Sequence, residues 1–328
     1  MRELSFPVLC QMLAEPKKTL ILCHARPDGD AIGSAFALKV ILQMKGSEAY
    51  CASADEVPKR LRFLTTSIQS GSMTAPMPED FLPERIITVD TPSLAQLGAP
   101  GVMFGDNITL MIDHHKAATP YAPAYIDPNA AAAGEIVYRI ADALLSAHGI
   151  PFPMDLCRCL YAAISSDTGG FRYSNVTPTT HMIAGSLIKS GVDAAEINRL
   201  LFDCKTPARL LAERVALENL KFCCEGKIAF STISYEEILK KGLDPEELDV
   251  FVETARSVAG VEIAFSVRQM TPGDEYRFSV RSNGKADVAA ICTAFGGGGH
   301  IKAAGCSLRA PSMEVAVETF LREAVKQL

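Results

Sequence analysis

The sequence predicts an α/β protein with two domains, and three observations support that prediction. Short apolar segments alternate with helical segments over the first half of the chain, as in a mainly parallel sheet. After about residue 190 the pattern changes to a polar helical stretch and then to an alternating β-hairpin. The length of 328 residues suits two cores. We expect a first domain at 1–190, a helical connector at 191–222 and a smaller α/β domain at 223–328.

The elements of the first domain follow from apolar runs and from helix-end signals. Three apolar runs are predicted as buried strands, at 19–24, 85–90 and 107–113. Helices are predicted at 30–46, 133–149, 154–166 and 177–191. Gly46 ends the first helix, and the last one has Thr177 as its cap and Pro178 at its first position.

The second domain is predicted from a strand, a hairpin and a glycine run. Residues 227–234 form the strand, and residues 261–284 form a hairpin that turns at 272–274. Apolar and polar residues alternate after the turn, so one face of the hairpin is apolar and the other polar. A helix at 286–295 leads into the glycine run 296–299, and a last strand and helix follow.

Composition and net charge disfavour several classes of function. Hydrophobic residues are 48% and charged residues 21%, as in globular proteins, and no apolar stretch approaches a membrane span. A net charge of −6 disfavours the broad basic surface that grips long duplex nucleic acid, although a few arginines and metal ions would still hold a short anion. Ten scattered cysteines form no Cys-x-x-Cys pair, which indicates reduced thiols. We therefore expect a cytoplasmic protein without a membrane partner.

Aspartate and histidine side chains follow the predicted strands at the points where the strands end. The carboxyl ends of parallel strands meet at one edge of a sheet, which is where ligands bind in open α/β folds. A fourth contribution comes from the end of the helix before residue 167. The residues are His24, Asp28 and Asp30 after the first strand, Asp90 after the second, Asp113, His114 and His115 at the third, and Asp167.

Each of these side chains also has an ordinary structural interpretation. Asp28 and Asp30 could cap the helix that follows them, and Asp90 and Asp167 could be turn residues. Four element ends that place such groups at one edge are harder to attribute to turns, because crowded carboxylates repel one another unless cations neutralise them. Oxygen and imidazole groups without thiolates favour two divalent ions, Mn²⁺ or a similar ion more than structural zinc.

Five stretches of the sequence resemble the motifs of a known family. HARPDGDAIGS at 24–34, VDT at 89–91, DHH at 113–115 and SSDTGGFRYSNVT at 165–177 resemble, in order, the four motifs of the DHH phosphoesterases. FGGGGHIKAAG at 295–305 resembles the signature of the DHHA1 domain that follows them in that family. Within the family, the two-domain length is similar to the nanoRNase and pAp phosphatase branch. The resemblance implies two-metal hydrolysis of phosphate esters, with the active site in the cleft between the domains.

The resemblance also implies a role for each residue of the first domain. His24 and Asp28 would bind one metal ion, Asp30, His114 and Asp167 would bind the other, and Asp90 would bridge them. His115 would face the substrate as a general acid or a phosphate ligand, and Asp113 would orient a histidine of the site.

The second domain is expected to bind the phosphate or the nucleotide. Glycines let backbone N–H groups approach a phosphate closely, although a bare glycine run is also typical of a flexible linker. Arg281 could form a bidentate pair with a terminal phosphate, or it could be a solvated arginine at a strand end. The predicted substrate-binding residues are Arg281, Ser282, Gly297, Gly298, Gly299 and His300.

The expected function is hydrolysis of short single-stranded RNA to mononucleotides and of pAp to AMP. Cyclic di-AMP or its linear product pApA is the first alternative substrate. A family II pyrophosphatase is disfavoured because its C-terminal Ser-Arg-Lys-Lys-Gln motif is missing, and a RecJ-like exonuclease would be longer. A non-catalytic nucleotide sensor is disfavoured because all six candidate metal ligands are present. The sequence does not decide the oligomeric state, for which a homodimer is one open alternative.

Overall fold

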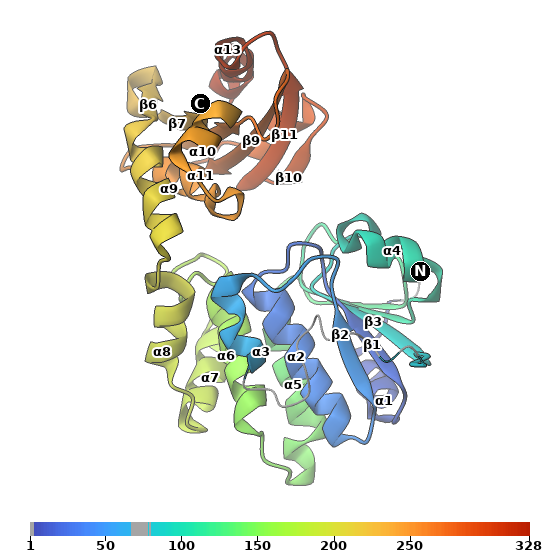
Figure 1. Cartoon of the computed structure of the whole chain (residues 1–328). Helices are drawn as coiled ribbons and strands as arrows, with labels where there is room; N and C mark the ends of the chain where they lie inside the picture. The colour runs from blue at the N-terminus through green and yellow to red at the C-terminus, as the bar shows by residue number, and fades with distance from the viewer. Residues whose placement is uncertain (1–2, 67–77, 79) are drawn as a thin grey trace. The chain divides into compact units, whose positions relative to one another are not determined.

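The computed structural model describes residues 3–66, 78 and 80–328 of the chain (Figure 1). The chain folds into two compact units, Met1–Cys204 and Lys205–Leu328. The predicted connector contributes to both units, because its first helices belong to the first unit and its last helix to the second. Within the described part of the chain, no helix has the length and apolar character needed to cross a bilayer.

A five-stranded parallel sheet forms the centre of the first unit, in the order β2-β1-β3-β4-β5. The parallel sheet confirms the predicted fold class. The alternation of apolar runs did not reveal β2 and β5, which are short and only partly buried. The strands are β1 (Thr19–Leu22), β2 (Ala49–Ala52), β3 (Arg85–Val89), β4 (Leu110–Asp113) and β5 (Ala124–Ile126).

Both faces of this sheet are buried, which explains the uninterrupted apolar runs. Ile21 and Ile87 pack with the helices α2, α5 and α6, whereas Leu20 and Ile86 pack with the segment that follows β3. The helices are α1 (Phe6–Ala14), α2 (Gly29–Met44), α3 (Phe63–Thr66), α4 (Ala99–Phe104), α5 (Ala133–Leu144), α6 (Met154–Asp167), α7 (Pro178–Lys189) and α8 (Ala194–Asn198), followed by a π-helical turn at Arg199–Asp203.

Glycines let α2, α5 and α6 approach one another closely. A Cβ atom on Gly33 of α2 would lie 2.5 Å from the carbonyl oxygen of Cys159 in α6. A Cβ on Gly29 would collide with Ser166, and a Cβ on Gly134 of α5 would also collide with α6. Since α2 begins beside two of the candidate ligands and α6 ends at another, this contact positions the acidic edge described below.

Replacing Gly33 with alanine should therefore destabilise the protein by about 1–3 kcal/mol, because the added methyl group overpacks a backbone contact. The matched control is Gly185→Ala in α7, where a Cβ meets nothing within 4 Å. That change should stabilise the protein by about 0.5–1 kcal/mol, since alanine is the better helix former. Urea unfolding of both variants measures the difference, and equal effects would show that the helix contact is not tight.

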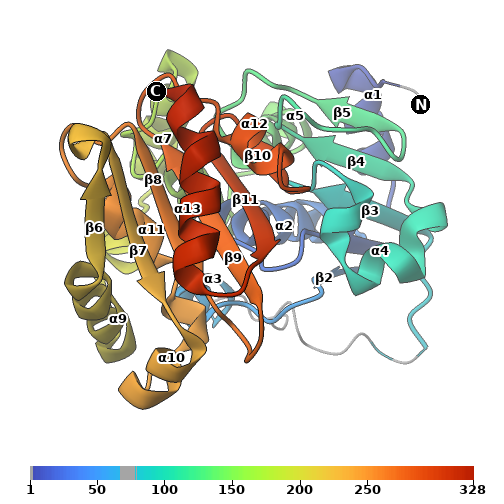
Figure 2. The same cartoon turned by 90° about the horizontal axis from the view of Figure 1, so that it is seen from above.

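A six-stranded mixed sheet forms the second unit, in the order β10-β11-β9-β8-β7-β6 (Figure 2). The predicted hairpin is confirmed, because β8 and β9 pair antiparallel from Ile263 opposite Ser282 to Arg268 opposite Arg277. Part of the glycine run is not a loop but a short strand. The strands are β6 (Leu220–Cys223), β7 (Ile228–Ile233), β8 (Ile263–Arg268), β9 (Glu275–Ser282), β10 (Gly298–His300) and β11 (Ala303–Arg309).

Helices cover both faces of the second sheet. The core on one face joins Phe265 and Phe278 to Phe320 of the last helix, with stacked or tilted rings. On the other face, Ala264 of β8 packs with Ala255 of α11. The helices are α9 (Pro207–Glu218), α10 (Tyr235–Lys241), α11 (Val250–Arg256), α12 (Val288–Thr293) and α13 (Met313–Ala324).

Candidate metal centre

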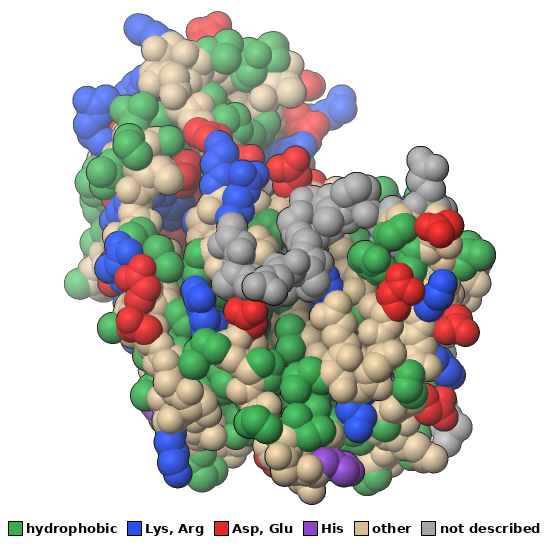
Figure 3. All heavy atoms as spheres, turned by 60° about the horizontal axis from the view of Figure 1, so that its bottom comes forward, with side chains coloured by type: hydrophobic (Ala, Val, Ile, Leu, Met, Phe, Trp, Pro, Cys, Tyr) green, Lys and Arg blue, Asp and Glu red, His purple; other side chains and the backbone are tan. Residues whose placement is uncertain are grey.

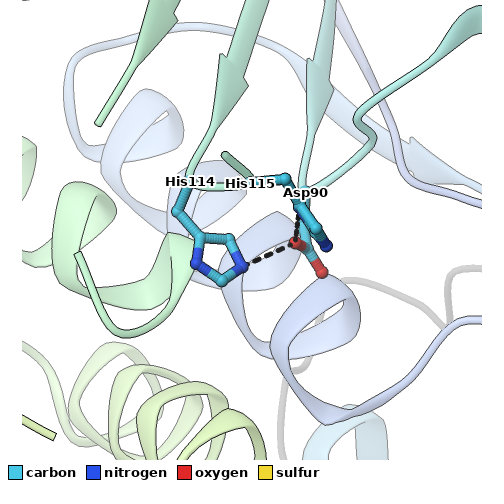
Figure 4. A group of neighbouring side chains, drawn as sticks. All are labelled: Asp90, His114 and His115. Atoms are coloured by element: carbon cyan, nitrogen blue, oxygen red, sulfur yellow. Dashed lines mark ion pairs between the residues drawn. The ribbon is translucent and has the colours of Figure 1, made fainter. Parts of the chain in front are cut away.

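The carboxyl ends of β1, β3 and β4 bring the predicted acids and histidines together. Asp90 follows β3 directly, and His114 and His115 follow β4, so the three side chains converge at one edge of the sheet (Figure 4). Asp90 is in the left-handed region with φ of 53°, which is unusual for a residue other than glycine. This backbone bend directs the carboxylate toward the histidines instead of continuing the strand.

One group of side chains surrounds His114, whose side chain is only 10% exposed. Its Nε2 atom lies 3.4 Å from Asp90 Oδ1, 3.3 Å from Asp167 Oδ2 and 3.7 Å from Asp30 Oδ2. The three carboxylates come from the first sheet, from the end of α6 and from the start of α2. Residues far apart in the sequence therefore meet around a single imidazole nitrogen.

A second group surrounds His24. Its Nε2 atom lies 3.8 Å from Asp28 Oδ1 and 3.7 Å from Asp90 Oδ2. Asp90 thus has one oxygen facing His114 and the other facing His24. These are the two sets of residues that the sequence motifs imply for two ions, with Asp90 shared by both.

The nitrogen-to-oxygen distances in both groups fit ligands that share a metal ion better than they fit direct hydrogen bonds. Two ligands at about 2.0–2.2 Å from one ion are roughly 3.0–3.5 Å apart, close to the separations above. Asp90 Oδ1 and His114 Nε2 are buried and have no hydrogen-bond partner among the described residues. Buried polar atoms without partners are rare, so these two atoms are suited to bind a cation.

Backbone contacts hold both imidazole rings with Nε2 toward the carboxylates. His24 Nδ1 lies 2.8 Å from the carbonyl oxygen of Ala25, and His114 Nδ1 lies 3.2 Å from that of Ala130. A carbonyl oxygen can only accept, so each Nδ1 carries the proton in the neutral ring and each Nε2 presents its lone pair to the site. This arrangement is typical of histidines that bind metals.

Burial and crowding shift the pKa values of this cluster. Burial and the nearby Asp90 raise the pKa of Asp30 to about 7. Burial and the neighbouring carboxylates also hold the pKa of Asp167 well above its ordinary value. Burial alone would lower the pKa of His114, but Asp90, Asp30 and Asp167 outweigh it and raise the pKa to about 11. The crowded carboxylates therefore favour positive charge among them, whether protons or a cation.

Asp28 caps the helix that follows it, as predicted, whereas Asp30 lies inside that helix and caps a different one. Asp28 Oδ1 accepts hydrogen bonds from the backbone N–H groups of Asp30 and Ala31 and so caps α2. Asp30 reaches across to α5, where Ala133 N–H donates to Oδ2 at 2.6 Å and Gly134 N–H donates to Oδ1 at 2.9 Å. A helix without a capping side chain of its own thereby fixes the Asp30 carboxylate.

His115 has a different environment from His114. Its side chain is 43% exposed, and both its backbone N–H and its Nδ1 contact Asp113 Oδ1, at 2.7 and 2.9 Å. Asp113 is fully buried at the end of β4. The Asp113 carboxylate thus fixes the orientation of the His115 ring through Nδ1, and the role of His115 toward a substrate stays a prediction.

The predicted substrate-binding residues lie in the second unit, where they form a group of their own. Arg281 pairs with Ala303 across β9 and β11, and Ala303 pairs with His300 across β11 and β10. Paired residues project from the same face of a sheet, so Arg281 and His300 belong to one row. Ser282 is buried, whereas Gly298 and Gly299 belong to β10 and Gly297 precedes it.

Two residues of the site were missed by sequence reasoning. Asn175 donates from Nδ2 to the backbone carbonyls of Ala131 and Asp167, at 2.9 and 3.1 Å, and so ties the end of α6 to the loop before α5. Ser34 donates to Asp30 Oδ1 at 2.8 Å. Both residues lie inside the motif stretches of the sequence. The partner of Asn175 at Ala131 is distant in sequence, and that of Ser34 is one helical turn away, so residue type alone did not indicate these hydrogen bonds.

Comparisons with known proteins identify the family of each unit. The chain matches the DHH family, N-terminal domain, over residues 18–164 and the DHHA1 domain over residues 225–327. It is 30% identical over 309 residues to the bifunctional oligoribonuclease and PAP phosphatase NrnA of Thermus thermophilus, a match that covers 94% of this chain and 89% of the relative.

Two solved structures share the fold. An exopolyphosphatase-related protein from Bacteroides fragilis matches with a TM-score of 0.83 at 22% identity, over 98% of this chain and 95% of that one. An exonuclease RecJ bound to manganese matches with a TM-score of 0.51 at 14% identity, over 99% of this chain and 94% of that one.

A parallel sheet whose edge gathers aspartates and histidines, followed by a mixed-sheet unit, defines a protein of the DHH class. The chain belongs to the DHH phosphoesterase family, and its second unit contains a DHHA1 domain.

Proposed function

We propose that this phosphoesterase hydrolyses short single-stranded RNA to mononucleotides and pAp to AMP, with two divalent ions at the edge of the first sheet. The observation that supports the ions most directly is the position of Asp90, whose two oxygens face two separate groups of ligands. Its Oδ1 has no hydrogen-bond partner among the described residues, which leaves that oxygen available to a cation.

The chain's own residues would divide the work between binding and proton transfer. Divalent ions in such a site polarise phosphoryl oxygens and activate water. Asp28, Asp30 and Asp167 would supply the negative charge that binds the ions, and the hydrogen bonds to helix N-termini keep the first two carboxylates in place. His115, oriented by Asp113, donates a proton to the leaving oxygen or a hydrogen bond to the phosphate.

Manganese is the proposed metal. The donor set combines carboxylate oxygens with imidazole nitrogens and contains no thiolate, which suits Mn²⁺ better than structural zinc. The manganese bound to the RecJ exonuclease of similar fold agrees with this choice.

Several features favour a short substrate. The relative from Thermus thermophilus has a name that pairs oligoribonuclease with PAP phosphatase activity. The net charge is −6, and on the face drawn in Figure 3 lysine and arginine side chains are interspersed with aspartate and glutamate. Arg281 and His300 offer a few cationic or polar contacts, enough for a terminal phosphate but not for a long backbone.

One assay with Mn²⁺ tests the substrate. We expect kcat/KM for pAp and for RNA dimers to pentamers to exceed that for a long RNA by about tenfold or more. This factor is roughly the worth of one charge-assisted phosphate contact, which we expect the long RNA not to make. Cyclic di-AMP, pApA and pyrophosphate are assayed in parallel. A preference for cyclic di-AMP or pApA would replace the proposed substrate, and no hydrolysis of any compound would favour a nucleotide sensor.

A further inference from the structure

Arg281 has an acidic neighbour that the sequence did not indicate. Glu253 of α11 places Oε1 3.5 Å from Arg281 Nε, and its side chain is 42% exposed. Arg281 is itself 27% exposed and donates from Nη1 to the carbonyl oxygen of Val280 at 3.1 Å. Two of the three guanidinium nitrogens are therefore already engaged, one of them by a carboxylate.

The position of Glu253 is held by the structure around it. Its Oε2 lies 3.9 Å from Nη1 of Arg256, one turn later in the same helix. Arg256 is fixed in turn by Asn283, which accepts from its Nε at 3.2 Å and donates to its carbonyl oxygen at 2.8 Å. Asn283 lies two residues after Arg281. The carboxylate thus belongs to a connected set of side chains at the end of β9.

We propose that Glu253 is an internal anion that competes with the terminal phosphate of the substrate and product for Arg281, and so limits product retention. This inference rests on the proposed function, in which Arg281 binds that phosphate. A phosphate that pairs with Arg281 in the bidentate manner must displace Glu253 from Nε or share the guanidinium with it. A terminal phosphate with about two charges competes well for the guanidinium, whereas a diester with one charge competes poorly.

The consequence concerns release as much as binding. The mononucleotide product has the same terminal phosphate as the substrate, so a site that gripped this group without opposition would stay occupied after hydrolysis. The Glu253 carboxylate lowers the affinity of Arg281 for the phosphate of the substrate and of the product. It pairs with Arg281 again when the product leaves. Because both side chains are partly solvated, the effect should be moderate, about 3–10-fold.

The test is Glu253→Gln, which keeps the shape and removes the charge. With Mn²⁺ and pAp, we expect the inhibition constant of AMP and the KM of pAp each to fall by about 3–10-fold, while kcat does not rise. Glu218→Gln, which removes an equal charge from an exposed pair with Lys241, is the matched control and should change neither constant. Thermal unfolding of both variants checks that the fold is kept.

A double variant separates competition from a general charge effect. In the Arg281→Ala background, Glu253→Gln should no longer lower either constant, because the guanidinium for which Glu253 and the phosphate compete is absent. An unchanged inhibition constant in Glu253→Gln, or an equal gain without Arg281, would overturn the inference. If Arg281→Ala itself weakens pAp and AMP binding while Glu253→Gln is silent, only this inference fails. If Arg281→Ala changes neither, the phosphate-binding role of Arg281 fails as well.

Discussion

Asp90→Asn should abolish Mn²⁺-dependent hydrolysis, with a loss of about 10³-fold or more. A single preorganised electrostatic partner is worth about 10²–10³-fold in other enzymes, and Asp90 faces both groups of ligands at once. The amide is nearly isosteric but leaves one neutral oxygen where the carboxylate offered two charged ones. Higher Mn²⁺ concentrations should not restore the rate, because the shared ligand is lost to both ions.

Thermal unfolding with and without Mn²⁺ separates this loss from misfolding. The wild-type protein should gain stability on adding Mn²⁺, because a ligand that binds only the folded state stabilises it. Asp90→Asn should gain much less, yet it should fold at least as well as the wild type without metal, since it removes one of several crowded carboxylates. Asp142→Asn, an exposed position on α5, is the control for charge and should behave as the wild type. Full activity in Asp90→Asn, or in the presence of chelator, would refute the two-ion centre.

Replacing His114 and replacing His115 with alanine should have different effects on turnover and on the stability gained with Mn²⁺. His115→Ala should lose about 10²–10⁴-fold in kcat, the usual contribution of a general acid, and keep the Mn²⁺-induced gain in stability. His114→Ala should lose both, because its buried Nε2 faces three carboxylates and has no hydrogen-bond partner among the described residues. The measurements are single-turnover hydrolysis of pAp and thermal unfolding with Mn²⁺.

Asp113→Asn is the companion variant for His115. It should lower kcat by roughly 10–100-fold, as expected when the partner that orients a functional imidazole is changed, and it should leave the response to Mn²⁺ intact. His115 Nδ1 also lies 3.7 Å from Asp90 Oδ1, which is the contact that would make it a metal ligand instead. If His115→Ala loses the Mn²⁺ response as completely as His114→Ala, the division between the two histidines is wrong.

The sequence by itself determined the fold class and which aspartates and histidines gather at one edge of the first sheet. Apolar runs that are buried on both faces predicted the parallel strands, and such strands must end at a common edge. Asp90 and His114 could therefore be placed near each other without knowledge of the structure. The short strand β2, with half of its residues only partly buried, left no comparable pattern.

Tertiary structure decided how each of these residues is used. Asp30 could be a helix cap or a ligand by sequence; in the structure it caps α5, more than 100 residues away, and still faces His114. The separate surroundings of His114 and His115 depend on which side of the strand end is buried. Glu253 lies on α11, and its ion pair with Arg281 forms only because α11 packs on the second sheet. Local patterns specify which chemical groups reach an edge, whereas burial and partners, which decide charge and availability, arise only when distant segments pack together.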